Sequence, residues 1–268
     1  PIHVGETDAA RWRASVASCY DRLGAAAFRP ARHYYYRRII HRLRQMVEPG
    51  ARVLEIGCGD GELLAAMRPS VGVGMDLSES MIGEARRRFP DLRFVHGCGE
   101  DVHDLSDTFD YVIISQTLGE VYDVQTLLHS VQRVCHARTR LLIVHESRVW
   151  QPALRLMEWL RIKNPSPEKN WLPSDEVTHL LSLADFETIR MFGLTIAPIR
   201  VPLLSDFLNR VVGNLPIVND FALNYVIVAR TVRPDLIQAK KPRSVSIVVP
   251  ARNEAGHIAL GVPDGLQL

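Results

Sequence analysis

The sequence has few cysteines, almost no lysine and no long apolar run, and each shortage excludes a class of protein. Its four cysteines include no CxxC pair, which excludes a disulfide framework and a zinc knuckle and is typical of a reducing compartment. The longest apolar runs, such as 141–144, are far shorter than the roughly 18 to 20 residues that span a bilayer. We therefore expect a cytoplasmic location, with the inner membrane surface as the alternative.

The basic residues are almost all arginine. Of the 32 lysines and arginines, only those at 163, 169, 240 and 241 are lysine, and ten of the arginines fall in 11–52. Such a segment could attract phosphates or anionic lipid. Arginine-rich codon usage explains the skew more simply than a nucleic-acid surface does, so we expect no nucleic-acid partner.

Short apolar runs alternate with amphipathic helices along most of the chain. The N-terminal part, 6–47, reads as helical and ends at Pro49 and Gly50. Strands separated by helices are typical of a parallel sheet that is covered on both faces. The expected strands are 52–56, 71–75, 92–95, 111–115 and 141–145, with helices from Glu62, from Ser78 and from about Val124.

The segment after 150 follows a different pattern. We expect helices near 151–161 and 174–183, then strands at 185–191 and 225–230 that form an antiparallel edge on the sheet. Between these strands, 203–212 is an amphipathic helix that acts either as a packed lid over the substrate or as a membrane-surface anchor.

The most informative segment is a glycine loop between a strand and a helix, Val53-Leu-Glu-Ile-Gly-Cys-Gly-Asp-Gly-Glu62. Glycines let the backbone turn tightly, and the helix N-terminus offers unpaired N–H groups to a ligand. Asp76 ends the next strand, where it can accept hydrogen bonds from ribose hydroxyls. A nicotinamide dinucleotide site requires a third glycine at the position of Glu62, so that alternative is disfavoured. Glu55 would repel a pyrophosphate but suits an ammonium group.

These residues resemble the class I S-adenosylmethionine (SAM)-dependent methyltransferases. Residues 53–61 resemble the first motif of that family, 75–81 the ribose and adenine segment, 93–101 the third-strand motif and 109–116 the fourth-strand motif. The resemblance implies an α/β fold: a Rossmann-like, seven-stranded, mostly parallel sheet with helices on both faces and an antiparallel edge strand. It covers roughly residues 45–230.

The resemblance also implies a set of cofactor-binding residues. Asp76 binds the ribose, Leu77 and Met81 flank the adenine, and the other positions line the methionine end or lie below the cofactor. One departure concerns the adenine amino group, because Cys98 stands where the family carries an aspartate; Glu100 or Asp101 compensates, or backbone groups hold the adenine. The expected set is Glu55, Gly57, Cys58, Gly59, Asp76, Leu77, Met81, Gly99, Glu100, Ser115 and Gln116.

The chemistry needs no universal catalytic residue, because the sulfonium already activates the methyl group. An oxygen nucleophile would benefit from a general base, and His145 and Glu146 follow the fifth strand at the expected place. Gln116 could orient the acceptor. A purely structural role for His145 is the alternative. His96 and His103 have no partners at metal-ligand spacing, so we expect no metal.

The last segment carries a second resemblance. Residues 244–256 are similar to the opening strand of family 2 glycosyltransferases, but the acids that such enzymes need downstream are missing. We expect a methyltransferase domain at 1–235 with an N-terminal helical cap at 1–48, a linker at 236–243, and a truncated, poorly ordered glycosyltransferase start at 244–268. The full-length protein would then carry a covalently fused glycosyltransferase.

The predicted function is SAM-dependent methyl transfer, at oxygen, to a small-molecule or glycan/lipid-linked acceptor, with peripheral membrane contact as an option. The alternative is a non-catalytic SAM-binding domain that regulates or scaffolds the fused glycosyltransferase. Both predict that the chain binds SAM, and only the first predicts turnover.

Overall fold

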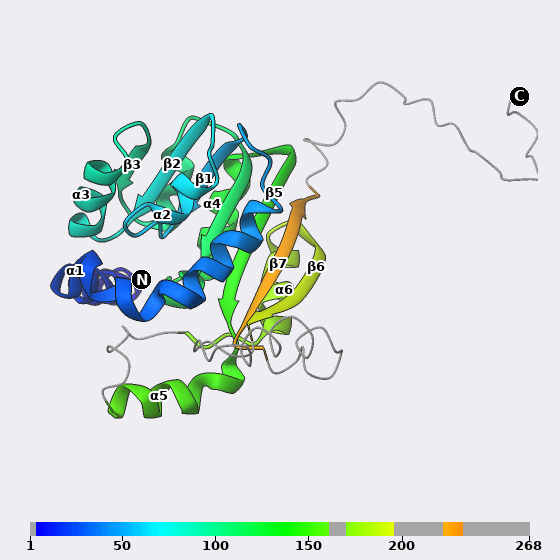
Figure 1. Cartoon of the computed structure of the whole chain (residues 1–268). Helices are drawn as coiled ribbons and strands as arrows, with labels where there is room; N and C mark the ends of the chain where they lie inside the picture. Colours follow the sequence, from blue (N-terminus) through cyan, green and yellow to red (C-terminus); the bar gives the residue numbers. More distant parts are fainter. Residues whose placement is uncertain (1–3, 161–169, 196–221, 233–268) are drawn as a thin grey trace, which may run out of the picture.

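The computed structural model describes residues 4–160, 170–195 and 222–232, which form one seven-stranded sheet with helices on both faces (Figure 1). The strand order is β3-β2-β1-β4-β5-β7-β6. Five strands, β3 to β5 in this order, run parallel, and β7 is antiparallel to both of its neighbours. The strands are β1 (Arg52–Ile56), β2 (Val71–Asp76), β3 (Arg93–His96), β4 (Phe109–Ser115), β5 (Cys135–Glu146), β6 (Phe186–Thr195) and β7 (Asn224–Thr231).

This arrangement confirms the predicted fold class and refines its edge. The inverted strand β7 lies between β5 and β6, so the outermost strand is β6. Strand β5 begins six residues before the apolar run that predicted it, because 136–140 is mostly polar and gives no apolar signal. The sequence pattern therefore located only the continuously buried part of β5.

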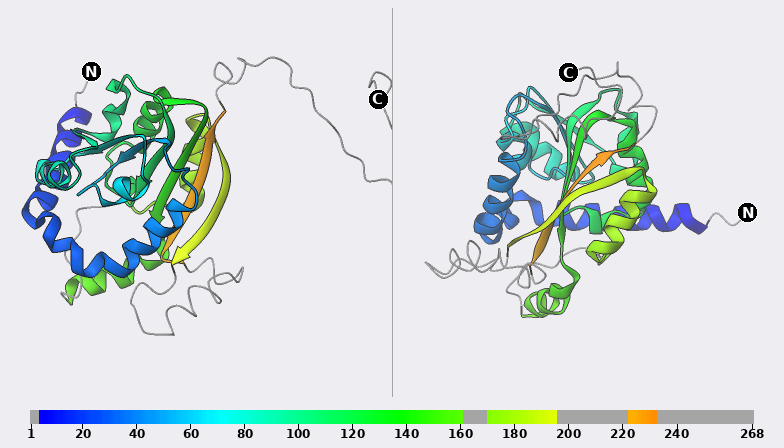
Figure 2. Two further views of the ribbon diagram at one scale, coloured as in Figure 1. Left: turned by 45° about the horizontal axis from the view of Figure 1, so that its top comes forward. Right: turned by 90° about the vertical axis from the view of Figure 1, so that its right-hand side faces the viewer.

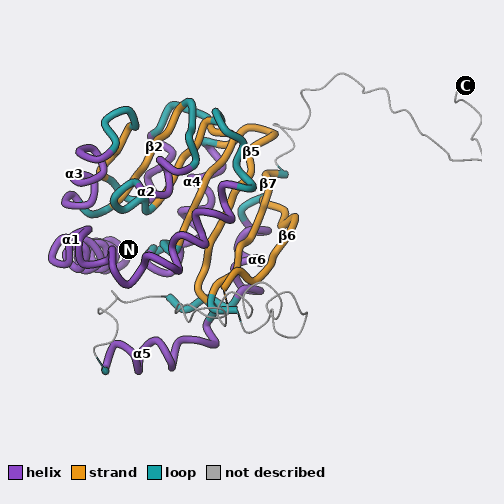
Figure 3. Tube along the Cα trace, in the orientation of Figure 1, coloured by secondary structure: helices purple, strands orange, loops and turns teal. Residues whose placement is uncertain are grey.

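The helices cover the sheet in two layers, and three short 3₁₀ turns lie in the loops (Figure 3). Ser78 caps α3 by accepting a hydrogen bond from the Met81 N–H, and Asp123 caps α4 by accepting one from the Thr126 N–H. The helices are α1 (Val4–Arg44), α2 (Glu62–Ala66), α3 (Glu79–Arg88), α4 (Val124–Arg133), α5 (Gln151–Trp159) and α6 (Ser174–Leu183), and the 3₁₀ turns are η1 (Gly99–Asp104), η2 (Leu118–Glu120) and η3 (Arg148–Trp150).

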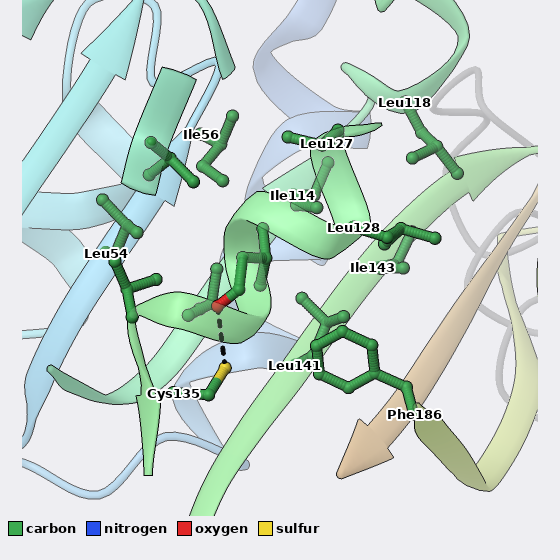
Figure 4. Packing of buried hydrophobic residues seen from close by; sticks show 14 of the residues in the cluster. Leu54, Ile56, Ile114, Leu118, Leu127, Leu128, Cys135, Leu141, Ile143 and Phe186 are labelled. Atoms are coloured by element: carbon green, nitrogen blue, oxygen red, sulfur yellow. Dashed lines mark hydrogen bonds between the residues drawn. The ribbon is translucent and has the colours of Figure 1, made fainter. Parts of the chain in front are cut away.

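Each face of the sheet has its own hydrophobic core. Helices α4 and α6 cover one face, where Leu127 and Leu128 pack among Leu54, Ile114 and Phe186 (Figure 4). The other face is covered by α2, α3 and the second half of α1. Its buried side chains include Ile39, Leu43, Leu63, Leu64 and Ile82, packed against Val53, Ile113 and Val144. Because β1 and β4 contribute to both cores, their carboxyl ends are fixed from both sides.

The predicted N-terminal helix is present, but it is broken. Within α1, Gly24 has φ 62° and ψ 164°, which interrupts the helical geometry. Glycine adopts positive φ without the steric cost that a Cβ brings. The first half of α1 therefore turns away from the second and passes beside the carboxyl edge of the sheet (Figure 2).

Several expectations fall outside the described residues. They are the amphipathic helix 203–212, the linker 236–243 and the glycosyltransferase-like strand 244–256, so the division into domains stays a prediction. Within the described ranges, no helix is long and apolar enough to cross a membrane. The four cysteines are all described, and none forms a disulfide.

Candidate cofactor site

A cavity of about 280 Å³ opens at the carboxyl edge of the parallel strands. The loops after β1, β2, β3 and β4 meet there, as expected at the point where the strand order reverses. Ten of the eleven expected cofactor residues line it. They are Gly57, Cys58, Gly59, Asp76, Leu77, Met81, Gly99, Glu100, Ser115 and Gln116.

The glycine loop has the backbone geometry that the sequence predicted. Gly57 has φ +73°, and a Cβ built on it would lie 1.9 Å from the Thr117 Oγ1 atom. The N–H groups of Gly57 and Cys58 both donate to the carbonyl oxygen of Met75, at 2.8 and 3.0 Å. Only glycine fits at position 57, because any side chain would collide with the loop that follows β4.

Asp76 joins the glycine loop to the end of β2. Its carboxylate accepts hydrogen bonds from the Gly59 N–H at 2.8 Å and from the Ser78 N–H at 2.9 Å. Burial disfavours the charged form and raises the pKa of Asp76 to about 6, and the charges of Glu120 and Asp21 add to this shift. The two backbone donors oppose the shift, so they help to keep an acceptor of hydrogen bonds at the cavity wall.

Glu55 is the one expected cofactor residue that the cavity does not include. It lies one position from the cavity-lining Ile56, and alternation along β1 turns it to the opposite face, where Val53 packs beneath α1 and α2. Glu55 is fully buried, and burial raises its pKa well above the usual value. The expected contact between a charged Glu55 and an ammonium group is therefore corrected: the structure does not bring this carboxylate to the cavity.

The two candidate bases also lie outside the main cavity. His145 and Glu146 line a separate pocket of about 10 Å³, which shares only Gln116 with the larger cavity. The Nε2 atom of His145 lies 2.5 Å from the carbonyl oxygen of Leu172. This geometry favours the structural alternative for His145, and it leaves Gln116 as the one expected catalytic residue at the cavity.

Cys98 stands where the family carries an aspartate, and in the structure the nearby acid Glu100 lies at the cavity. Glu100 is 3% exposed and lines the cavity, whereas Asp101 is exposed and does not. The Cys98 thiol donates to one Glu100 oxygen, and the Arg13 guanidinium lies 3.4 Å from the other. Burial and the neighbouring Glu100 raise the pKa of Cys98 to about 12, so the thiol stays protonated as a donor. Of the two acids considered, Glu100 is the one in place.

The first half of α1 adds side chains that the sequence did not predict. Arg13, Val16 and Tyr20 line the cavity. The Tyr20 hydroxyl donates to the Glu120 carboxylate at 2.6 Å, and the Asp21 carboxylate accepts from the Ser78 hydroxyl at 2.6 Å. These contacts join residues 100 and 57 positions apart. No local pattern in the sequence could have indicated them.

Two further arginines, Arg37 and Arg88, line the cavity and differ in their surroundings. Arg88 pairs with Asp60, just as Arg13 pairs with Glu100. No acid among the described residues pairs with Arg37, which follows Tyr36 in the second half of α1. The Arg37 guanidinium is suited to a ligand that carries an anionic group.

In the described part of the chain, no group of three or more His, Cys, Asp or Glu residues could hold a metal ion. The expected absence of a metal stays a prediction.

Comparison with known proteins shows similarity to methyltransferases. A family model described as a methyltransferase domain matches residues 28–190, more than half of the chain. A demethylmenaquinone methyltransferase of Geobacillus kaustophilus (strain HTA426) is 32% identical over 130 residues, 44% of this chain and 54% of the relative. A 2-phytyl-1,4-naphtoquinone methyltransferase of Synechococcus elongatus is 30% identical over 119 residues, 40% of this chain and 51% of the relative. The chain thus spans about half the length of these curated relatives.

Solved structures share the fold at low sequence identity. A SAM-dependent methyltransferase of Thermotoga maritima has a TM-score of 0.58 at 17% identity, covering 81% of this chain and 100% of that one. Magnesium protoporphyrin IX methyltransferase of Synechocystis PCC 6803 with bound SAH has a TM-score of 0.55 at 14% identity, covering 82% and 99%. At these identities the likeness establishes the fold alone.

Proposed function

The chain belongs to the methyltransferase-domain family, and from that premise we propose that it transfers the methyl group of SAM to a small-molecule acceptor held at the carboxyl edge of the sheet. The predicted enzyme class and cofactor agree with this membership. One observation carries the proposal. Asp76 and the glycine loop, hydrogen-bonded to each other, form the wall of a cavity that ten of the expected cofactor residues line.

The proposed cofactor pose follows the motif assignments. Asp76 accepts from the ribose hydroxyls, because its carboxylate is fixed at the end of β2 by two backbone donors. Leu77 and Met81 flank the adenine. Gly57 and Gly59 line the methionine end, and the space beside Gly59 is open because a Cβ there would meet nothing within 4 Å.

Charge pairing suggests where the methionine carboxylate lies. Arg13 and Arg88 are each paired with an acid, whereas Arg37 has no acidic partner in the part of the chain that the structure describes. A guanidinium binds a carboxylate through strong charge-assisted hydrogen bonds. We therefore assign the carboxylate end of the cofactor to Arg37, a residue outside the expected set.

The acceptor is proposed to be a small molecule with an apolar part. The names of the relatives specify naphthoquinone acceptors, which supports this class for the present chain. In the proposed step, a hydroxyl oxygen of the reduced acceptor gives its electron pair to the methyl carbon. The carbon–sulfur pair stays on sulfur, which becomes a neutral thioether, and the hydroxyl proton leaves to a base. Methylation at a ring carbon of the same acceptor is the alternative outcome.

Glu120 is the proposed proton acceptor in place of His145 and Glu146. It is 7% exposed, lines the main cavity and is held by the Tyr20 hydroxyl at 2.6 Å. Its backbone carbonyl also accepts from the Trp12 indole N–H at 2.8 Å. A carboxylate positioned in this way can receive a proton within the cavity.

The function is tested by binding and turnover. Calorimetric titration of the full chain with SAM should give one site, and Asp76→Ala should weaken binding by about tenfold or more, since it removes a charged hydrogen-bond acceptor. Asp101→Ala is the matched control and should bind like the parent, because Asp101 is exposed and outside the cavity. Incubation with reduced 2-phytyl-1,4-naphthoquinone should release S-adenosylhomocysteine (SAH), and NMR of the product identifies the methylated atom.

The binding and turnover results test different parts of the proposal. Absence of SAM binding would contradict the proposal as a whole. Binding without turnover on reduced naphthoquinones or simple phenols would favour the non-catalytic alternative, in which the domain regulates or scaffolds a fused partner. Equal binding by the Asp76 and Asp101 variants would contradict the pose.

We propose that Glu100 accepts a hydrogen bond from the adenine amino group. Replacing adenine by hypoxanthine in the ligand tests this contact. The wild-type chain should prefer SAH to S-inosylhomocysteine, because hypoxanthine presents an oxygen acceptor where adenine presents an amino donor. In Glu100→Gln the amide can donate to that oxygen, so the preference should fall by roughly tenfold, the size of one or two hydrogen bonds.

Asp101→Asn is the control for the base exchange and should keep the wild-type preference. An unchanged preference in Glu100→Gln would assign adenine recognition to backbone groups instead. Competition calorimetry with the two nucleosides measures both variants.

A further inference from the structure

Large apolar side chains are exposed along α5 and the turn before it. The exposed fractions are 61% for Val149, 54% for Leu156, 77% for Trp159 and 50% for Leu160. Helix α5 follows the carboxyl end of β5 and lies beyond the body of the domain (Figures 1 and 3). Soluble surfaces normally show such residues singly, so four of them within twelve positions indicate a contact surface. We call Val149, Leu156, Trp159 and Leu160 the α5 face.

The α5 face is one-sided and bordered by positive charge. With 3.6 residues per turn, Leu156, Trp159 and Leu160 fall within an arc of about 100°. Arg155 lies about 40° beyond Trp159 on the same helix, and Arg148 precedes it in η3. Both arginines are exposed. Glu158, the one acid of α5, is half-buried and falls on the other side of the helix.

We propose that the α5 face docks on the surface of an anionic lipid bilayer. A one-sided apolar helix with a tryptophan and flanking arginines matches an interfacial helix: the apolar side chains enter the acyl boundary and the guanidiniums meet lipid phosphates. Tryptophan suits this boundary because it combines a large apolar ring with an N–H donor. A neutral protein surface would satisfy the apolar side chains but not the two arginines.

Docking through the α5 face would bring the opening of the cavity to the bilayer. The cavity opens at the carboxyl edge of the sheet, and α5 leaves the sheet at the same edge, after β5. An acceptor with a long hydrocarbon chain, such as the phytyl group named in one relative, would reach the cavity from the bilayer. This use rests on the proposed function, whereas the docking itself does not.

Vesicle flotation of the full chain tests the docking. The wild-type chain should float with vesicles that mix phosphatidylglycerol and phosphatidylcholine, and high salt should weaken binding because it screens the arginines. Leu156→Glu with Trp159→Glu should lower the partition coefficient at least tenfold, since each change removes apolar contact and adds a charge of the wrong sign. The blue shift of tryptophan emission on vesicle addition should disappear in Trp159→Phe.

The control variant changes a comparable surface elsewhere. Ile189 and Met191 on β6 are 50% and 44% exposed, and Ile189→Glu with Met191→Glu should float like the wild type. Failure of the wild type to float, or equal loss in both double variants, would overturn the proposal. If the wild-type chain forms a dimer and the double variant Leu156→Glu with Trp159→Glu is a monomer, the α5 face is instead an interface between copies. SAM titration of every variant shows separately whether the cofactor proposal holds.

Discussion

Replacing Gly57 by Ala should lower the free energy of unfolding by about 3 kcal/mol or more, because two costs add at this position. The first is the positive φ of 73°, which a Cβ makes unfavourable by roughly 1–2 kcal/mol. The second is a collision that places the new Cβ 1.9 Å from Oγ1 and 2.7 Å from Cβ of Thr117. The Thr117 Cβ cannot rotate away, so the loop after β4 must shift. Urea denaturation measures the change.

Gly59→Ala is the matched control in the same loop. Gly59 also has positive φ, at 52°, but a Cβ there meets nothing within 4 Å. It should therefore cost only the conformational term, about 1–2 kcal/mol. Thr117→Gly should recover part of the stability lost in Gly57→Ala and none of that lost in Gly59→Ala. Equal losses at positions 57 and 59 would contradict the steric explanation.

The sheet could be predicted from the sequence because the signals that mark its strands are local. Apolar runs such as 111–115 mark strands that are buried on both faces, and the glycines at 57 and 59 mark a turn with positive φ. Both signals lie within a few residues of the element that they predict. The position of β7 between β5 and β6 has no such signal, since it depends on pairing between strands far apart in the sequence.

The residues of the candidate site also fall into those with a local sequence signal and those without one. Asp76 ends β2 and Gln116 directly follows β4, so both reach the cavity, and a strand end can be recognised in the sequence. Glu55 fails to reach it because side chains alternate between the faces of β1, and the motif spacing does not state which face is covered. His145 fails because a backbone carbonyl from the distant Leu172 occupies its ring nitrogen.

The contribution of the N-terminal helix α1 was the least predictable part of the site. The helical pattern of 6–47 indicated a helix, but nothing in it indicated that Gly24 would turn the first half toward the cavity. The turn brings Tyr20 to Glu120 and Arg13 to Glu100, so two acids of the cavity are positioned from the N-terminal segment. A truncation that starts at the first motif would therefore remove part of the candidate site.

Arg37→Met should weaken SAH binding by roughly 10–100-fold, the equivalent of one charge-assisted hydrogen bond of about 1.5–3 kcal/mol. The same change should leave the affinity for decarboxylated SAH, S-adenosyl-3-thiopropylamine, almost unaltered, because that ligand has no carboxylate for the guanidinium to bind. Calorimetry with both ligands measures the loss that belongs to the carboxylate alone. Any general damage to the cavity would weaken both ligands equally.

Arg44→Met provides the control, because Arg44 is an exposed arginine in the last turn of the same helix and does not line the cavity. It should bind both ligands like the parent chain. Arg37→Lys should keep part of the preference for SAH, since it retains the charge but not the bidentate geometry. A preference for SAH that survives in Arg37→Met would contradict the assignment of the carboxylate to Arg37. The N–H groups of Gly57, Cys58 and Gly59 could not replace it without a rearrangement, because they already donate to Met75 and Asp76.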